Sequence, residues 1–189
     1  MNFDKIRTKF IELSKTPSDI NEHLDDLASL AKECSHVTEM GIRSCVSTWA
    51  FLYGKPEKLV SYDIHYHDNF EEVKQARPDW EVHVVDVLKV DIEPTDLLFI
   101  DTLHTYTQLK KELKKHGNKA KKYLVFHDTE TYGYTPEPAS WQTPEIMKNY
   151  KDNDKGLMPA INEFMDENPD WYIYKQKRNN NGLLILKRA

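Results

Sequence analysis

Two short apolar runs in the sequence end in side chains that could bind a metal ion or move a proton. The run LLFI at 97–100 leads into Asp101, with His104 three residues later, and the run YLVF at 123–126 leads into His127 and Asp128. Each run has the length of a buried strand. Ligands of open parallel sheets bind outside the carboxyl ends of the strands. If the two strands are neighbours, two carboxylates and two imidazoles meet at one edge of the sheet.

The residue types indicate two kinds of chemistry. Asp101 and Asp128 suit a hard divalent cation such as Mg²⁺, which takes oxygen ligands. His104 could take a proton from a substrate hydroxyl, since its ordinary pKa lies near neutrality; the alternative is a loop histidine that bonds a local carbonyl. His127 is either a core histidine or a third ligand of a softer ion such as Mn²⁺ or Fe²⁺.

A second candidate site lies upstream, where a predicted strand, a tight turn at Gly41 and a predicted helix follow one another. Glycine allows close approach of the backbone, and a helix N-terminus offers free N–H groups to a nucleotide-like ligand. The second and third glycines typical of such loops are absent, and Arg43, Ser44 and Cys45 stand there. Asp63, roughly twenty residues later, is favoured as a ligand of a ribose diol over a helix cap.

Two further groups of side chains follow predicted strand ends. Asp86 comes after the third predicted strand, where an adenine could be recognised. His65 and His67 form an H-x-H pair in a predicted loop. Because residues two apart share a face only on a strand, we expect these histidines to be exposed or to touch a cofactor rather than to bind zinc.

The hydrophobic pattern places these residues in an α/β fold. Strands and helices alternate from residue 36 to residue 126, which favours βαβ units and a parallel sheet of five strands. A long loop at 132–154 and a helix at 156–167 precede two strands joined by a turn-forming run at 179–182, which predicts an antiparallel hairpin. We expect residues 1–34 to form a helical segment packed on a domain of residues 35–189. The predicted helices span 3–16, 20–34, 46–53 (closed by Gly54), 70–76 and 106–116, and the predicted strands span 36–40, 59–64, 80–85, 95–100, 123–126, 171–174 and 183–186.

Composition restricts the possible partners. The 189 residues carry a net charge of −5 with mixed signs, so no general attraction for nucleic acid is expected. The basic run at 110–122 is interpreted as a solvated helix face around Leu109 and Leu113, and a phosphate-binding patch is the minority interpretation. No apolar run reaches the roughly 18 residues of a membrane span. With only Cys34 and Cys45 and no apolar leader in MNFDKIRTKF, we expect a cytoplasmic protein without a disulfide framework.

These features together resemble class I S-adenosylmethionine-dependent methyltransferases, most closely the subgroup of cephalosporin-hydroxylase-like proteins and macrolide-sugar O-methyltransferases. The resemblance covers about residues 35–188 and rests on EMGIRSCVST, the Asp63 strand end, FIDTLHTY, FHDT and NNNGLLILKR. It implies a Rossmann-like mixed sheet of seven strands with the last one antiparallel, and a cofactor lying over Glu39, Gly41 and Asp63. In metal-dependent relatives the aspartate of D-x-x-H binds Mg²⁺ and the histidine is the base, which are Asp101 and His104 here. An acidic pair supplies the other ligands in those relatives, and of this pair only Asp128 carries over.

The sequence therefore predicts an enzyme that methylates a hydroxyl of a sugar or other small molecule with divalent-metal assistance. Two other classes stay open: a methyltransferase-fold protein that binds a ligand without chemistry, and a metal-dependent oxygenase or hydrolase. A homo-oligomer through the two leading helices is also open. The expected S-adenosylmethionine contacts are Glu39, Gly41, Ser44, Asp63, Asp86 and Asp101, and the expected metal ligands are Asp101, His127 and Asp128.

Overall fold

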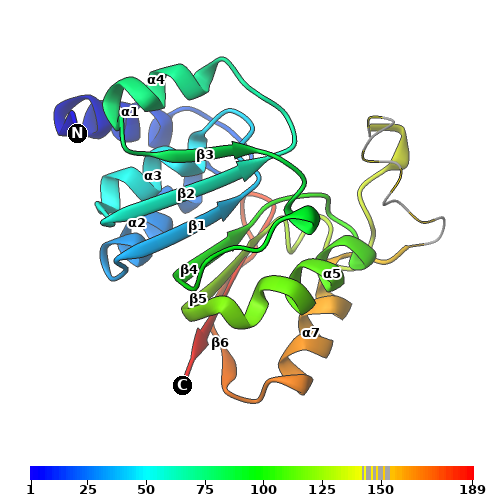
Figure 1. Ribbon diagram of the computed structural model, residues 1–189. Coiled ribbons are helices and arrows are strands. Elements are labelled where there is room, and N and C mark those ends of the chain that lie inside the picture. Colours follow the sequence, from blue (N-terminus) through cyan, green and yellow to red (C-terminus); the bar gives the residue numbers. More distant parts are fainter. Residues whose placement is uncertain (142, 144–145, 147, 149–150, 152–153) are drawn as a thin grey trace.

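A seven-stranded mixed sheet forms the centre of the protein, seen here in a computed structural model (Figure 1) that describes residues 1–141, 143, 146, 148, 151 and 154–189. The strand order is β3-β2-β1-β4-β5-β7-β6. Strands β1 to β5 run parallel, and β7 pairs antiparallel with both β5 and β6. The predicted Rossmann-like sheet with a C-terminal antiparallel hairpin is confirmed. The strands are β1 (His36–Met40), β2 (Lys58–Asp63), β3 (Glu81–Val84), β4 (Thr95–Ile100), β5 (Ala120–His127), β6 (Trp171–Lys177) and β7 (Leu183–Arg188).

Helices cover both faces of the sheet, so its central strands are apolar on both sides. In β4, Leu97 and Phe99 pack into one core, whereas Leu98 and Ile100 pack into the other. This alternation follows from the two-residue period of a strand. The first core is covered by α1 (Phe3–Lys15), α2 (Leu24–Lys32), α3 (Val46–Gly54) and α4 (Asn69–Ala76), and the second by α5 (Tyr106–His116) and α7 (Leu157–Glu167).

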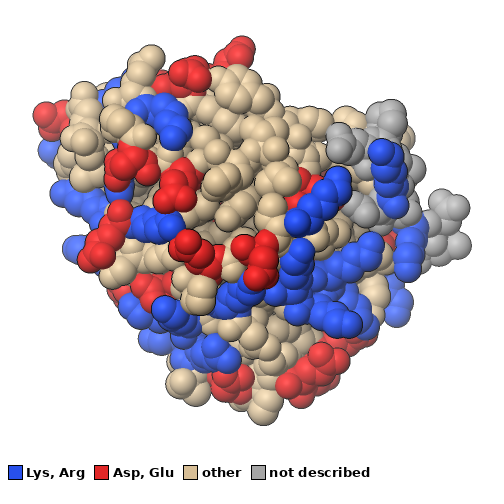
Figure 2. All heavy atoms as spheres, viewed as in Figure 1, with Lys and Arg blue, Asp and Glu red and all other residues tan. Residues whose placement is uncertain are grey.

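The N-terminal segment packs against α3. Ile6 and Phe10 of α1 are buried there, and the Phe10 ring stacks on Tyr53 with centroids 4.1 Å apart. Among the described residues, no helix combines the length and the apolar character needed to cross a bilayer. The lysines of α5 at 110, 111 and 114 are exposed while Leu109 and Leu113 are buried, as the solvated-face interpretation expects, and Figure 2 shows basic side chains gathered over α5.

The structure differs from several predicted boundaries. Gly54 does not end α3 as a left-handed cap, since it lies within the helix and Lys55 adopts the left-handed conformation with φ +62°. Gly54 is instead required for packing, because a Cβ there would lie 2.6 Å from the Ala28 carbonyl oxygen. The second predicted helix begins as a 3-10 turn, η1 (Asn21–His23), before α2. Strand β5 begins at Ala120, three residues before the predicted start, and part of the predicted 132–154 loop lies outside the described residues.

The topology fixes where a ligand can bind. Strand order reverses between the hydrogen-bonded neighbours β1 and β4. From β1 the sheet continues to β2 and β3, and from β4 it continues in the opposite direction to β5. A crevice opens outside the carboxyl ends of the strands at such a point. Gly41 and Asp101, which follow β1 and β4, therefore lie side by side.

Candidate active site

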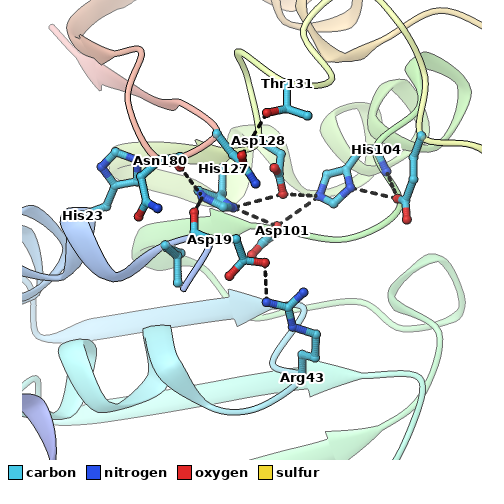
Figure 3. A network of polar contacts seen from close by, with 12 residues as sticks. Asp19, His23, Arg43, Asp101, His104, His127, Asp128, Thr131 and Asn180 are labelled. Atoms are coloured by element: carbon cyan, nitrogen blue, oxygen red, sulfur yellow. Dashed lines mark hydrogen bonds and ion pairs between the residues drawn. The ribbon is translucent and has the colours of Figure 1, made fainter. Parts of the chain in front are cut away.

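Asp101, His104 and Asp128 converge at the carboxyl ends of β4 and β5. His104 Nε2 lies 3.1 Å from Asp101 Oδ1 and 3.1 Å from Asp128 Oδ2. One ligand atom from each of these three residues lies within 4.8 Å of the other two, which is compact enough to hold one ion. Figure 3 shows the three side chains pointing toward one another. The juxtaposition expected from the two strand ends is therefore present.

His127 borders the same pair of carboxylates from the buried side. Its Nε2 faces the carbonyl oxygens of Asp19 and Asn180 at 3.0 and 3.2 Å, so this nitrogen carries a proton and donates. Its Nδ1 lies 3.1 Å from Asp128 Oδ2 and 3.5 Å from Asp101 Oδ1. Nδ1 is thus the ring nitrogen that could serve a metal, and the role of His127 as a third ligand stays a prediction.

Glu137 is a member of the site that the sequence did not indicate. Its Oε2 lies 2.8 Å from His104 Nδ1 and also accepts from the His104 backbone N–H at 3.3 Å. The Glu137 N–H in turn donates to the His104 carbonyl oxygen at 3.0 Å. Tyr132 stacks on the His104 ring, with centroids 5.0 Å apart and planes 13° apart. A lone glutamate in a long loop carries no sequence signal for this contact.

The charges at this centre stabilise one another. Burial alone would lower the pKa of His104, but hydrogen bonds to Asp101 and Glu137 raise it to about 10. For His127 the attraction of Asp101 and Asp128 likewise exceeds the effect of burial and raises the pKa to about 11. Burial would raise the pKa of Asp101, and the two imidazoles hold it below its usual range. With no ion bound, the acidic pair is therefore balanced by two imidazolium groups.

The loop after β1 has the backbone of a glycine-rich loop although only one glycine is present. Gly41 has φ +87°, and a Cβ there would lie 1.9 Å from the Asp101 carbonyl oxygen. Arg43 and Cys45 also adopt positive φ, at +45° and +64°, where side chains other than glycine are disfavoured. Asp128 at the end of β5 shares this conformation with φ +59°. Strained backbone of this kind concentrates at ligand-binding sites.

Asp63 fastens this loop from the end of β2. Its Oδ2 accepts from the backbone N–H groups of Ile42 and Arg43, both at 2.9 Å, and its Oδ1 accepts from the His65 N–H at 2.9 Å. The carboxylate still borders the open cavity and keeps lone-pair capacity on Oδ1. Asp63 therefore shapes the loop as well as bordering the cavity, and sequence spacing did not reveal this supporting role.

Glu39 lies behind the loop and does not line the cavity. It is fully buried and accepts hydrogen bonds from Ser47 at 2.6 Å, Ser61 at 2.7 Å and Thr48 at 2.9 Å. Burial raises its pKa to about 7 despite these bonds. The direct cofactor contact of Glu39 stays a prediction, and in this structure its carboxylate holds the start of α3 against β1 and β2.

One cavity of about 310 Å³ unites the loop after β1 with the acidic centre. Of the residues singled out in the sequence, those that line it are Gly41, Arg43, Ser44, Asp63, His65, His67, Asp86, Asp101, His104 and Asp128. The buried His127 and Glu39 do not line it.

The N-terminal segment closes one side of this cavity, which the sequence did not predict. Asp19 and Ile20 line it, and the Asp19 carboxylate pairs with the Arg43 guanidinium. His23 Nε2 lies 3.1 Å from the carbonyl oxygens of Asn179 and Asn180 in the β6–β7 turn. As Figure 3 shows, this turn and the N-terminal segment meet beside His127.

Comparison with known proteins identifies the fold. No family model matches the sequence, and no curated protein matches it. Solved structures do match, among them a putative caffeoyl-CoA O-methyltransferase from Staphylococcus aureus (14% identity, TM-score 0.63, covering 100% of this chain and 93% of that chain). A putative O-methyltransferase from Klebsiella pneumoniae matches at 14% identity and TM-score 0.63, covering 99% of this chain and 89% of that one.

The N-methyltransferase NodS from Bradyrhizobium japonicum WM9, solved with S-adenosyl-L-homocysteine, matches at 13% identity and TM-score 0.62, covering 100% of this chain and 98% of that one. The chain thus has the fold of class I S-adenosylmethionine-dependent methyltransferases.

Proposed function

We propose that this protein is an S-adenosylmethionine-dependent methyltransferase that acts, with a divalent cation, on a hydroxyl of a small molecule such as a sugar. One observation carries the proposal. Two features line the same cavity. One is the loop after β1, which has positive φ angles and is bonded to Asp63, and the other is the Asp101–His104–Asp128 group. Methyl transfer to oxygen needs these two parts side by side. The methyl group must be aligned with the acceptor oxygen, and a neighbouring base must remove the proton of that oxygen.

The residues present fit the cofactor. A Cβ at position 41 would clash with the Asp101 carbonyl oxygen. Glycine therefore lets the loop backbone pass close to the end of β4, at the cavity wall. Asp63 and Asp86 place carboxylate acceptors at the ends of β2 and β3, where a ribose diol and an adenine amine could donate. Ser44, next to Arg43 on the loop after β1, is exposed and lines the same cavity. These residues would hold the nucleoside, while Asp101 borders the reacting end.

The acidic centre fits a divalent cation. Asp128 Oδ1 is buried and has no hydrogen-bond partner among the described residues. Unpartnered buried acceptors of this kind are costly unless a ligand or ion satisfies them. Asp101 and Asp128 would hold the ion through oxygen, and His127 Nδ1 would be the nitrogen ligand. Such an ion would lower the pKa of a bound hydroxyl.

We assign the proton acceptor to His104. The acceptor oxygen would lose its hydrogen to His104 Nε2 and take the methyl group that the sulfonium of the cofactor supplies, whose carbon–sulfur bond would break to leave a neutral thioether. Glu137 holds Nδ1, so Nε2 is the nitrogen that faces the reacting centre. Nε2 must be free of its proton to act as a base, and neutralisation of Asp101 and Asp128 would remove two of the three carboxylate contributions that raise its pKa, leaving that of Glu137.

The first experiment measures cofactor binding by calorimetric titration with S-adenosylmethionine. We expect the wild type to bind and Asp63→Asn to bind at least about tenfold more weakly, since roughly 1.4 kcal/mol corresponds to a factor of ten. Asp68→Asn, an exposed carboxylate in the same post-strand segment, is the matched control and should bind as the wild type does. No binding by the wild type would reject the cofactor assignment.

The second experiment measures methyl transfer to a panel of sugars and simple phenols with Mg²⁺ or Mn²⁺ present. His104→Gln should lose about 10²–10⁴ in turnover, the usual contribution of general acid–base catalysis. His83→Gln on the exposed strand β3 is the control and should keep activity. Cofactor binding without transfer to any acceptor would favour a ligand-binding protein instead. Stoichiometric iron or zinc in the purified protein would favour the oxygenase or hydrolase alternative.

A further inference from the structure

Asn180 fastens the β6–β7 turn to the N-terminal segment beside the candidate metal centre (Figure 3). Its Nδ2 donates to the Ser18 carbonyl oxygen at 2.6 Å, and its Oδ1 accepts from the Glu22 N–H at 3.0 Å. These two bonds lie on either side of Asp19 in the chain. The φ of Asn180 is +48°, a conformation that asparagine tolerates better than most residues. One side chain therefore holds the segment that carries Asp19 against the turn.

This fastening brings two backbone acceptors to the buried side of His127. The carbonyl oxygens of Asp19 and Asn180 lie 3.0 and 3.2 Å from His127 Nε2. An imidazole nitrogen that faces two carbonyl oxygens carries a proton, because a carbonyl oxygen can only accept. In the neutral ring the lone pair is then on Nδ1, which lies 3.1 Å from Asp128 Oδ2. The contacts of Asn180 thus select the ring nitrogen that an ion can use.

His23 supports the same turn from the other side. It is fully buried, and its Nε2 lies 3.1 Å from the carbonyl oxygens of both Asn179 and Asn180. Its ring meets the His127 ring edge-on, with centroids 5.8 Å apart. The Asn180 carbonyl oxygen therefore faces two buried imidazoles, so a shift of the turn would disturb the donor side of His127.

We propose that Asn180 is a positioning residue of the metal centre, which keeps the proton of His127 on Nε2 and so offers Nδ1 to the ion. The inference rests on the divalent cation of the proposed function. A histidine ligand usually donates its other ring N–H to a carbonyl or carboxylate, which fixes the orientation of the ring. Loss of such a partner typically weakens metal binding by about 10–100-fold. Asn180 should therefore govern metal affinity although it touches neither the ion nor the substrate.

The test measures the Mn²⁺ affinity of the protein by electron paramagnetic resonance. Asn180→Gly removes both side-chain bonds and still permits the positive φ, and we expect the affinity to fall about 10–100-fold. Asn181→Gly is the matched control, since Asn181 has φ +69° and its side chain accepts from Thr131 rather than binding the N-terminal segment. This control should bind Mn²⁺ as the wild type does. Wild-type affinity in Asn180→Gly would overturn the inference and leave the proposed function intact.

A double-mutant cycle with His127→Gln separates positioning from a general effect on the fold. Because Asn180 acts through His127, Asn180→Gly should cause little further loss of Mn²⁺ affinity in the His127→Gln background. Additive losses would overturn the inference.

Pulsed electron paramagnetic resonance supplies a measurement that does not depend on Asn180→Gly being folded. The Mn²⁺-loaded wild type should show coupling to an imidazole nitrogen, and His127→Gln should lose it. Absence of this coupling in the wild type, or its persistence in His127→Gln, would overturn the inference. Failure of the wild type to bind either Mn²⁺ or Mg²⁺ would reject the inference together with the metal assistance of the proposed function.

Discussion

The carboxylate of Glu137 lies 2.8 Å from Nδ1 of His104, although the two residues are separated by 33 positions in the chain. The His104 backbone N–H also donates to the Glu137 carboxylate, and the Glu137 N–H donates to the His104 carbonyl oxygen. His104 Nε2 is left facing Asp101 and Asp128. The Glu137 carboxylate thus holds the Nδ1 side of the imidazole, while the Nε2 side faces the carboxylates of Asp101 and Asp128. This arrangement connects the loop after β5 to the reacting centre.

Replacement of Glu137 should therefore impair methyl transfer without impairing cofactor binding. We expect Glu137→Ala to lower kcat by about 10–100-fold, as is usual for groups that orient an active-site histidine. Glu137→Gln keeps an acceptor oxygen for Nδ1 and should retain more activity than the alanine variant. Steady-state kinetics with titration of S-adenosyl-L-homocysteine provide the measurement. Equal loss in both variants would indicate that the negative charge, rather than the orientation, is what matters.

Gly41→Ala should disrupt the junction of β1 and β4. The added Cβ would lie 1.9 Å from the Asp101 carbonyl oxygen at a residue with φ +87°. The backbone conformation alone costs about 1–3 kcal/mol for a residue other than glycine. Urea unfolding should show this loss, and S-adenosyl-L-homocysteine binding should weaken. Ser44→Ala, an exposed position of the same loop, is the control for stability. Wild-type stability and binding in Gly41→Ala would contradict the described geometry.

Asp128→Asn should weaken metal binding. Asp128 is 5% exposed, and its carboxylate contributes charge and an unpartnered Oδ1 to the candidate centre. Because carboxylate charge dominates affinity for hard cations, we expect Mn²⁺ affinity to fall at least about tenfold. Electron paramagnetic resonance of free Mn²⁺ measures this directly. Glu130→Gln, an exposed carboxylate two residues away, should leave the affinity unchanged. Similar Mn²⁺ binding by Asp128→Asn and the wild type would exclude this site.

Glu112 should make stability fall as the pH rises. Burial raises its pKa to about 7 in the folded protein, against its ordinary 4.5, and the hydrogen bonds from Gln108 and Thr102 only partly oppose this. Of its charged neighbours, His104 lowers this pKa and Asp86 raises it. The folded state therefore holds more protons than the unfolded state between pH 4.5 and 7, and the stabilisation is lost as the pH rises through that window.

Glu112→Gln removes this titration. The free energy of unfolding of the variant, minus that of the wild type, should increase between pH 5 and pH 8, so the variant becomes relatively more stable as the pH rises. The rise of the Glu112 pKa from 4.5 to about 7 corresponds to about 3 kcal/mol, since each pKa unit is worth about 1.36 kcal/mol. Urea unfolding at several pH values measures it, with Glu130→Gln as an exposed control. A pH-independent difference would show that Glu112 is not protonated in the folded protein.

Periodicity and turn residues were sufficient to predict most of the fold. Helix 106–116 and strands 36–40 and 95–100 coincide with the structure, because each combines a clear apolar period with a terminating residue. The predicted C-terminal end of α3 was wrong. Gly54 is needed for close packing on α2, and Lys55 rather than Gly54 takes the left-handed position. Such a choice depends on a neighbouring helix that the local pattern does not contain.

The candidate site divides in the same way. The sequence by itself determined that Asp101, His104 and Asp128 follow the ends of two buried strands, and parallel strands deliver such residues to one edge. Only the tertiary structure decided that Glu137 holds His104 and that Glu39 is buried behind the loop, bonded to Ser47, Ser61 and Thr48. These relationships depend on side chains brought together from distant segments, and no spacing along the chain encodes a distance across the fold.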